Sequence, residues 1–124
     1  MVTVTEIAFT GYPVTDVPRA RAFYEGVLGL KTGTVFQHEQ NFWIEYEVGP
    51  GTLAISNMSG GMWKPSPDGP SAALEMADFD AAIGALKAAA TRFLVEPMDS
   101  GPCRMAIVAD PDGNSLIIHQ RKKK

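Results

Sequence analysis

The sequence has few of the residues from which common catalytic centres are built. Cys103 is the only cysteine, so no disulfide can form within the chain, and the only histidines are His38 and His119. The sequence contains no G-x-S-x-G turn, no glycine-rich phosphate loop and no H-E-x-x-H helix. These absences argue against a serine hydrolase, a P-loop nucleotide-binding protein and a metalloprotease of that type.

Long apolar runs and an excess of positive charge are also missing. No stretch reaches the roughly 18 apolar residues that span a membrane, and the first ten residues lack the pattern of a signal peptide. The formal net charge is −3, and the basic end, 121–124, is interpreted as a solvated tail. A single cysteine suits a reducing compartment. We therefore expect a cytoplasmic protein with neither nucleic acid nor a membrane as its partner.

A weak internal repeat organises the 124 residues. The segments "IAFTGYPVTDVPRARAFYEGVLGL" (7–30) and "SAALEMADFDAAIGALKAAA" (71–90) each contain an apolar strand, an aspartate and a helical pattern. Each half then ends in a glycine-led strand, "GTLAIS" at 51–56 and "GNSLIIH" at 113–119. The chain is 45% hydrophobic and 20% charged, as is usual for a globular domain.

Two helices are predicted, one in each half. The first covers about 17–27, with Asp16 at its N-cap and Gly29 ending it. The second covers about 79–90, with Asp78 as its N-cap. Both aspartates can accept hydrogen bonds from the backbone N–H groups that a helix leaves unpaired at its start.

The strand "NFWIEYEV" (41–48) alternates between two faces. Phe42 and Ile44 are assigned to the face that packs against the helix, and Trp43 and Glu45 to the opposite face. A further strand, "CRMAIVAD" at 103–110, leads through the turn "DPDG" into the closing strand.

Each half is therefore expected to be a β-α-β-β-β module. The first module covers about 1–58, a linker rich in glycine, proline and serine covers about 59–69, and the second module covers about 70–120. We predict a single α+β domain, 1–124, in which the two modules form a curved sheet with a concave pocket.

The segments "PVTDVPRARAFYEGVLGLKTG" and "MAIVADPDGNSLIIHQ" closely resemble the vicinal oxygen chelate superfamily, the group of glyoxalase I, bleomycin resistance proteins and extradiol dioxygenases. In metal-bearing members, four positions facing the pocket supply His, Glu or Gln. The resemblance implies that these positions are Phe9, Ala54, Ser71 and Ile117 here. None is a usual ligand of a divalent metal, so we predict no metal and no cofactor.

The predicted pocket has apolar walls and a few polar groups. Met62 and Trp63, in the linker, are placed over its mouth. The candidate ligand-binding residues are Phe9, Trp43, Glu45, Ala54, Trp63, Ser71, Glu75, Arg104, Ile117 and His119.

Two classes of function follow from this pocket. The first is binding of a small aromatic or cationic molecule, as in bleomycin resistance proteins, because aromatic walls and carboxylates suit such a ligand. The alternative is a glyoxalase-type lyase or isomerase, or another small-molecule enzyme that needs no metal. A homodimer is expected because open sheets leave strand edges to cover. The sequence leaves open whether the protein catalyses a reaction and whether the modules pair within a chain or between chains.

Overall fold

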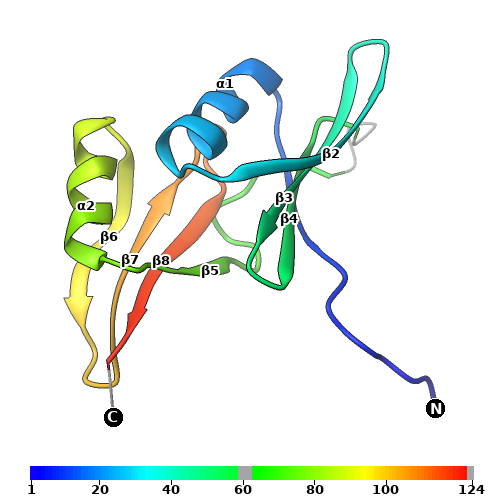
Figure 1. Cartoon of the computed structure of the whole chain (residues 1–124). Helices are drawn as coiled ribbons and strands as arrows, with labels where there is room; N and C mark the ends of the chain where they lie inside the picture. Colours follow the sequence, from blue (N-terminus) through cyan, green and yellow to red (C-terminus); the bar gives the residue numbers. More distant parts are fainter. Residues whose placement is uncertain (59–62, 123–124) are drawn as a thin grey trace. The chain divides into compact units, whose positions relative to one another are not determined.

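Two β-α-β-β-β units make up the chain in the computed structural model, which describes residues 1–58 and 63–122 (Figure 1). The units comprise residues 1–64 and 65–124, so their boundary falls inside the predicted linker. The expected α+β class and the order of elements are confirmed. The first residues of the linker, Met62 among them, and the last two lysines lie outside the described residues.

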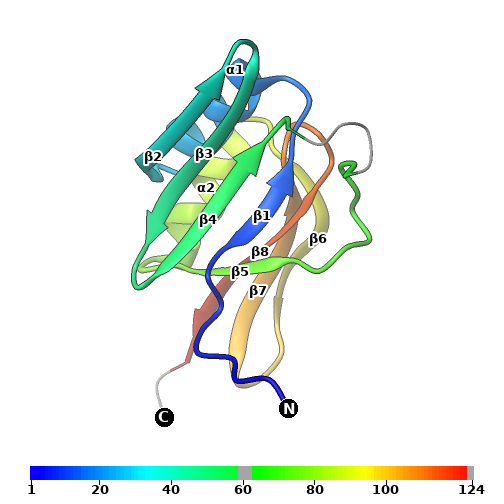
Figure 2. The same cartoon turned by 90° about the vertical axis from the view of Figure 1, so that its right-hand side faces the viewer.

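The first unit contains a four-stranded sheet in the order β1-β4-β3-β2, in which β1 is parallel to β4 and the other neighbours are antiparallel (Figure 2). Residues 1–9 precede this sheet as an extended arm (Figure 1). Its elements are β1 (Thr10–Pro13), α1 (Val17–Arg21), η1 (Ala22–Val27), β2 (Lys31–His38), β3 (Asn41–Val48) and β4 (Gly51–Ser56).

The predicted helix over 17–27 has the expected bounds, but its second half is a π-helix. The side chain of Asp16 accepts the backbone N–H three residues on at 3.0 Å, which confirms the cap. The wider π spacing appears in the hydrogen bond from the N–H of Leu28 to the carbonyl of Phe23, at 2.9 Å. Gly29 follows with a φ of +67°, which suits glycine and ends the helix.

The core of this unit lies between the helix and one face of the sheet. Tyr24 is fully buried and lies nearly parallel to Tyr46, with ring centroids 6.0 Å apart. The ring of Tyr12, in β1, lies 6.4 Å from the ring of Tyr24. Ile44 and Ile55 are also buried in this layer. Burial of these side chains is the main source of stability for a unit of this size.

A polar group also enters this core. The hydroxyl of Tyr46 donates a 2.8 Å hydrogen bond to the carboxylate of Glu25, which Arg21 also contacts at 2.6 Å. Burial raises the pKa of Glu25, but the hydrogen bonds from Arg21 and Tyr46 outweigh it and lower that pKa below its ordinary value. Burial, followed by the nearby carboxylate, raises the pKa of Tyr46.

The second unit has a sheet in the order β5-β8-β7-β6, with β5 parallel to β8. Its helix ends two residues before the predicted position 90, because Ala90 adopts a φ of +58° that no helix continues. The side chain of Asp78 accepts the N–H of Ala81 at 3.0 Å, as expected for a cap. The elements are β5 (Ala72–Glu75), α2 (Phe79–Ala88), β6 (Arg92–Asp99), β7 (Cys103–Ala109) and β8 (Ser115–Arg121).

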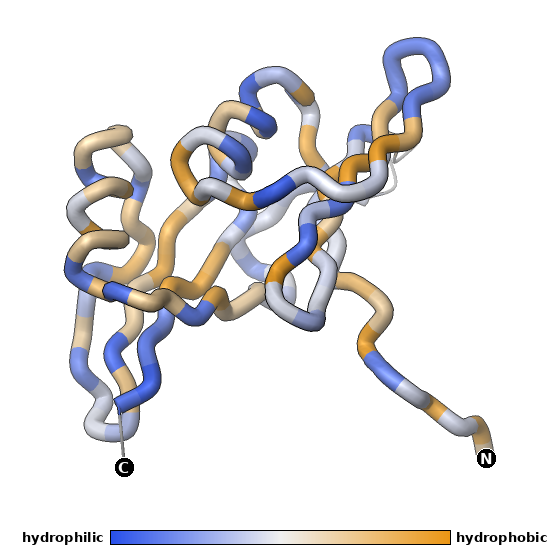
Figure 3. The backbone as a smooth tube through the Cα atoms, viewed as in Figure 1, coloured by the Kyte–Doolittle hydropathy of each residue, from blue (hydrophilic) through white to orange (hydrophobic). Residues whose placement is uncertain are grey.

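The predicted "DPDG" turn joins β7 to β8 and is held by the buried carboxylate of Asp110. That carboxylate accepts the backbone N–H groups of Asp112 and Asn114, each at 2.9 Å. Gly113 adopts a φ of +91°. The hydropathy pattern agrees with this layout, since β7 and the first part of β8 are largely apolar while the tip of the β2–β3 hairpin is hydrophilic (Figure 3).

Candidate ligand-binding site

Each sheet has one face covered by the helix of its own unit and one face that its helix does not cover; we call the second the open face (Figure 1). In β3, Ile44 is fully buried on the helix side. Trp43 and Glu45, its neighbours along the strand, therefore point to the open face. This is the orientation that the alternation of the sequence predicts.

Three aromatic side chains meet on the open face of the first unit: Phe9, Trp43 and Trp63, which we call the aromatic cluster. The ring of Phe9 meets Trp43 edge-on, with centroids 5.1 Å apart and planes at 88°. The rings of Trp63 and Trp43 are stacked, with centroids 6.5 Å apart and planes at 29°. Trp63, predicted to lie over a pocket, is thus placed against the indole of Trp43.

Phe36 extends this aromatic surface and was not among the predicted residues. It is the direct cross-strand neighbour of Trp43, so both side chains lie on the same face, and it is 59% exposed. A signal for it was present in the sequence. A hairpin in which His38 pairs with Asn41 necessarily sets residue 36 opposite residue 43.

Glu45 supplies a carboxylate that is hydrogen-bonded to the aromatic cluster. The indole Nε1 of Trp43 donates a hydrogen bond of 2.9 Å to its Oε2 atom. Within residues 1–58 and 63–122, Glu45 forms no ion pair, so its negative charge is not neutralised by a described side chain. The site therefore combines aromatic faces with an uncompensated negative charge.

Small residues form the part of the sheet beside this carboxylate. In the strand register, Gly11, Ala54 and Glu45 are neighbours across β1, β4 and β3. Ala54 is fully buried, and the rim of Trp63 lies against the backbone of Gly11. The structure thus brings all five predicted residues of the first unit onto one face of its sheet.

The open face of the second unit carries four of the five site residues predicted for that unit. Ser71 hydrogen-bonds through its hydroxyl to Ser115, and Ile117 lies two residues further along β8, opposite Ala73. Glu75 and His119 are neighbours on the parallel strands β5 and β8, with Oε1 and Nδ1 2.6 Å apart. The side-chain pair was not predicted, although both residues were.

The carboxylate of Glu75 is held at both oxygens. Its Oε2 atom accepts the backbone N–H of Arg121 at 2.7 Å. That hydrogen bond, followed by the one from His119, lowers the pKa of Glu75, so its carboxylate is ionised at neutral pH. When His119 is neutral, its proton must lie on Nδ1 to donate to Glu75, which leaves Nε2 as a proton acceptor.

The expectation that Arg104 lines the same surface is wrong. Its neighbour on β8 is Gln120, and it points to the helix side of β7 together with Ala106. There its guanidinium contacts Asp80 at 2.6 Å and lies 4.5 Å from the centre of the Phe79 ring. A carboxylate and an aromatic ring at the start of α2 hold the cation on that side.

The positions that the resemblance assigns to metal ligands do not fit a metal. Phe9, Ala54 and Ile117 have no donor atom, and the hydroxyl of Ser71 is paired with Ser115. Throughout the part of the chain that the structure describes, no three His, Cys, Asp or Glu side chains lie close enough together to hold a metal ion.

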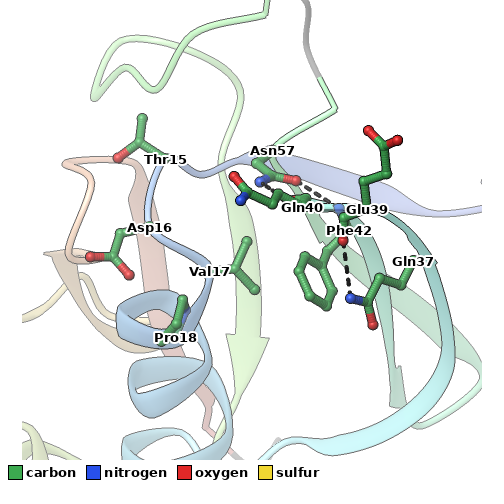
Figure 4. A pocket seen from close by; sticks show the side chains of 9 residues that line it. All are labelled: Thr15, Asp16, Val17, Pro18, Gln37, Glu39, Gln40, Phe42 and Asn57. Atoms are coloured by element: carbon green, nitrogen blue, oxygen red, sulfur yellow. Dashed lines mark hydrogen bonds between the residues drawn. The ribbon is translucent and has the colours of Figure 1, made fainter.

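A separate groove of about 500 Å³ lies on the helix side of the first unit, where Val17 and Phe42 project from α1 and β3 (Figure 4). None of the predicted site residues lines it. Its amide groups are largely committed already. Asn57 accepts the N–H of Phe42 at 2.7 Å and donates to the carbonyl of Gln40 at 2.9 Å. The groove therefore offers fewer free polar groups than its composition suggests.

The comparisons with known proteins agree with the fold. The family model described as "Glyoxalase/Bleomycin resistance protein/Dioxygenase superfamily" matches residues 6–118. No curated protein sequence matches the chain. Among the described residues, no helix has the length and apolar character needed to cross a membrane.

Solved structures share the fold at low sequence identity. TnmS3, an antibiotic binding protein from Streptomyces sp. CB03234, has a TM-score of 0.79 at 19% identity, over 98% of this chain and 100% of that chain. The fosfomycin resistance protein FosX from Listeria monocytogenes has a TM-score of 0.74 at 12% identity, over 97% and 96%. A member of the same superfamily from Sphaerobacter thermophilus has a TM-score of 0.72 at 19% identity, over 95% and 98%.

Proposed function

We propose a binding function for this chain, which belongs to the Glyoxalase/Bleomycin resistance protein/Dioxygenase superfamily. It binds a small planar aromatic molecule that carries positive charge, on the open face of the first unit. The observation that carries the proposal is the hydrogen bond between Trp43 and Glu45, which places beside an indole a carboxylate that forms no ion pair with any described side chain.

Aromatic and electrostatic complementarity support this ligand class. A flat cation can stack on the indole of Trp43 while its charge lies near Glu45, and cation–π attraction contributes about 0.5–2 kcal/mol. Phe36 lengthens the apolar surface on the β2 side of Trp43. TnmS3, described as an antibiotic binding protein, gives a precedent for small-molecule binding by this fold.

The test is a fluorescence titration with proflavine, a planar aromatic cation. Naphthalene-2-sulfonate, a planar anion, and tetraethylammonium, an aliphatic cation, serve as comparison probes. Phe36→Ala should weaken proflavine binding several-fold, whereas Val35→Ala, on the opposite face of the same strand, should not. Equal binding of the aromatic cation and the aromatic anion would contradict the role of Glu45.

We also propose that the protein is a cytoplasmic homodimer. An open sheet presents unpaired strand edges, and β2 is a long edge strand on which Val35 and Phe36 are exposed. Pairing with a second copy would cover such an edge. The single cysteine suits a reducing compartment.

An enzyme is the second candidate function, and the pair Glu75–His119 favours it. A carboxylate that orients an imidazole and leaves its Nε2 atom as proton acceptor is a common arrangement for general-base catalysis. In this alternative, His119 would take a proton from a small carbonyl compound without a metal.

The two candidates are separated by turnover of the adduct of methylglyoxal and glutathione, with and without added nickel or zinc. The binding proposal expects no lactoylglutathione above the uncatalysed rate under any of these conditions. Turnover that His119→Gln abolishes would favour the enzyme.

A further inference from the structure

We propose that Gly11 is a positioning residue for the ligand site: its missing side chain provides the space in which Trp63 lies beside Trp43. For ligand binding, the inference rests on the proposed function; for the arrangement of the two indoles, it rests on the structure of the first unit. It assigns a role to a residue of β1 that bears no chemistry itself.

The steric argument is direct. A Cβ atom built on Gly11 would lie 3.0 Å from Cη2 and 3.2 Å from Cζ2 of Trp63, and 3.5 Å from Cε1 of Phe9. Carbon atoms in ordinary contact are about 3.5–4.0 Å apart. An alanine would therefore push the indole of Trp63 by a few tenths of an ångström, and a branched side chain would displace it further.

The displacement would alter the aromatic cluster. Trp63 is inclined by 29° to Trp43 at a centroid distance of 6.5 Å, and its outer ring lies against β1. Ala54, the neighbour of Gly11 on β4, is also small. Gly11 therefore sets how closely the second indole approaches the sheet, and with it the width of the surface that a planar ligand meets.

This arrangement also predicts which ligands are affected. A flat aromatic cation gains contact from two indoles in a defined orientation, whereas tetraethylammonium interacts with the carboxylate of Glu45 and one ring face. Substitution at position 11 should therefore weaken proflavine binding much more than tetraethylammonium binding. A simple loss of folded protein would weaken both equally.

The first test needs no ligand. Trp43 and Trp63 are the only tryptophans in the chain, so the exciton couplet in the circular dichroism spectrum reports on this pair alone. In Gly11→Val the couplet should lose most of its amplitude, while Gly11→Ala should reduce it in part. Gly26→Ala is the control, because a Cβ at that position meets no atom within 4 Å. Thermal unfolding of each variant checks its folding, and valine is well suited to a strand.

The second test is a double-mutant cycle on proflavine binding. Gly11→Val should weaken binding about tenfold. The cycle itself compares Gly11→Ala in the wild type and in the Trp63→Phe variant. Phenylalanine lacks the indole atoms that crowd position 11, so Gly11→Ala should weaken proflavine binding in the wild type and have almost no effect on it in the Trp63→Phe variant. Equal costs in both backgrounds would overturn the inference.

The outcomes separate this inference from the proposed function. If the wild type fails to bind proflavine but Gly11→Val removes the couplet, the proposed function is wrong and the role of Gly11 in placing Trp63 stands. An unchanged couplet in a folded Gly11→Val protein overturns the role of Gly11, whether or not proflavine binds. If Gly11→Val does not fold, the couplet of Gly11→Ala decides.

Discussion

Trp43 and Glu45 point to the same side of β3, and the indole Nε1 of Trp43 donates a hydrogen bond of 2.9 Å to the Glu45 carboxylate. Residues two apart in a strand are about 7 Å apart along the backbone, so a long side chain on one can reach the other. The hydrogen bond orients the carboxylate along the edge of the indole. A bound aromatic cation would therefore meet an indole face and a negative charge together.

The two residues should contribute differently to binding of proflavine. Trp43→Ala removes the stacking surface and should weaken binding by about 1–3 kcal/mol. Glu45→Gln retains an oxygen that accepts the indole N–H but removes the charge, so it should weaken binding less than Trp43→Ala does. Because salt screens the attraction between the carboxylate and the cation, the effect of Glu45→Gln should be smaller at high salt than at low salt. Titrations at low and high ionic strength measure both effects, with Glu96→Gln on β6 as the matched control. A salt-independent effect of Glu45→Gln would argue against charge pairing.

Acid should destabilise the first unit through Glu25. Its pKa is lower in the folded protein than the unfolded value of about 4.3, so it stabilises the fold above that pH. This contribution disappears as the pH falls through the lower, folded-state pKa. We expect the difference in unfolding free energy between wild type and Glu25→Gln to be largest near neutral pH and to shrink below about pH 4. Urea unfolding at several pH values measures it, and a constant difference would contradict the pKa shift.

Removal of the Tyr46 hydroxyl tests the hydrogen bond that this hydroxyl donates to Glu25. Tyr46→Phe leaves the buried ring in place but removes one of the side-chain hydrogen bonds that hold Glu25 in the folded protein. The expected loss of stability at neutral pH is about 1–2 kcal/mol. It should be smaller in a Glu25→Gln background, as a double-mutant cycle would show.

The purified protein should carry no stoichiometric transition metal, because Phe9, Ala54 and Ile117 offer no donor atom at the positions where metal-bearing relatives have ligands. Elemental analysis of tag-free protein after dialysis is the measurement. About one zinc, nickel, iron or manganese ion per chain would show that other residues form a site.

A dimer should be measurable in solution. Sedimentation or light scattering is expected to give twice the chain mass of 13.3 kDa at micromolar concentration. Val35→Lys places a charge on the exposed edge strand β2 and should shift the equilibrium toward monomer. A protein that stays monomeric at tens of micromolar would refute the dimer.

The local structure follows from the sequence alone. Asp16 and Asp78 predict both helix starts, and the alternation in 41–48 and the glycine that begins 51–56 predict two strands. These signals act between residues close along the chain, through caps, turns and the two-residue period of a strand. For the same reason, the orientation of Trp43 and Glu45 followed from the pattern alone.

Features that depend on contacts between distant segments are set only in the folded protein. Arg104 lies in a strand with apolar residues on both faces, so the alternation of residues does not show which face of the sheet carries its side chain. Contacts with Asp80 and Phe79 hold that side chain against α2. The approach of Trp63 to Gly11 joins a loop to the first strand across 52 positions, and no local pattern encodes it. Side-chain space and long-range pairing arise only when the chain is packed, and these set the shape of the candidate site.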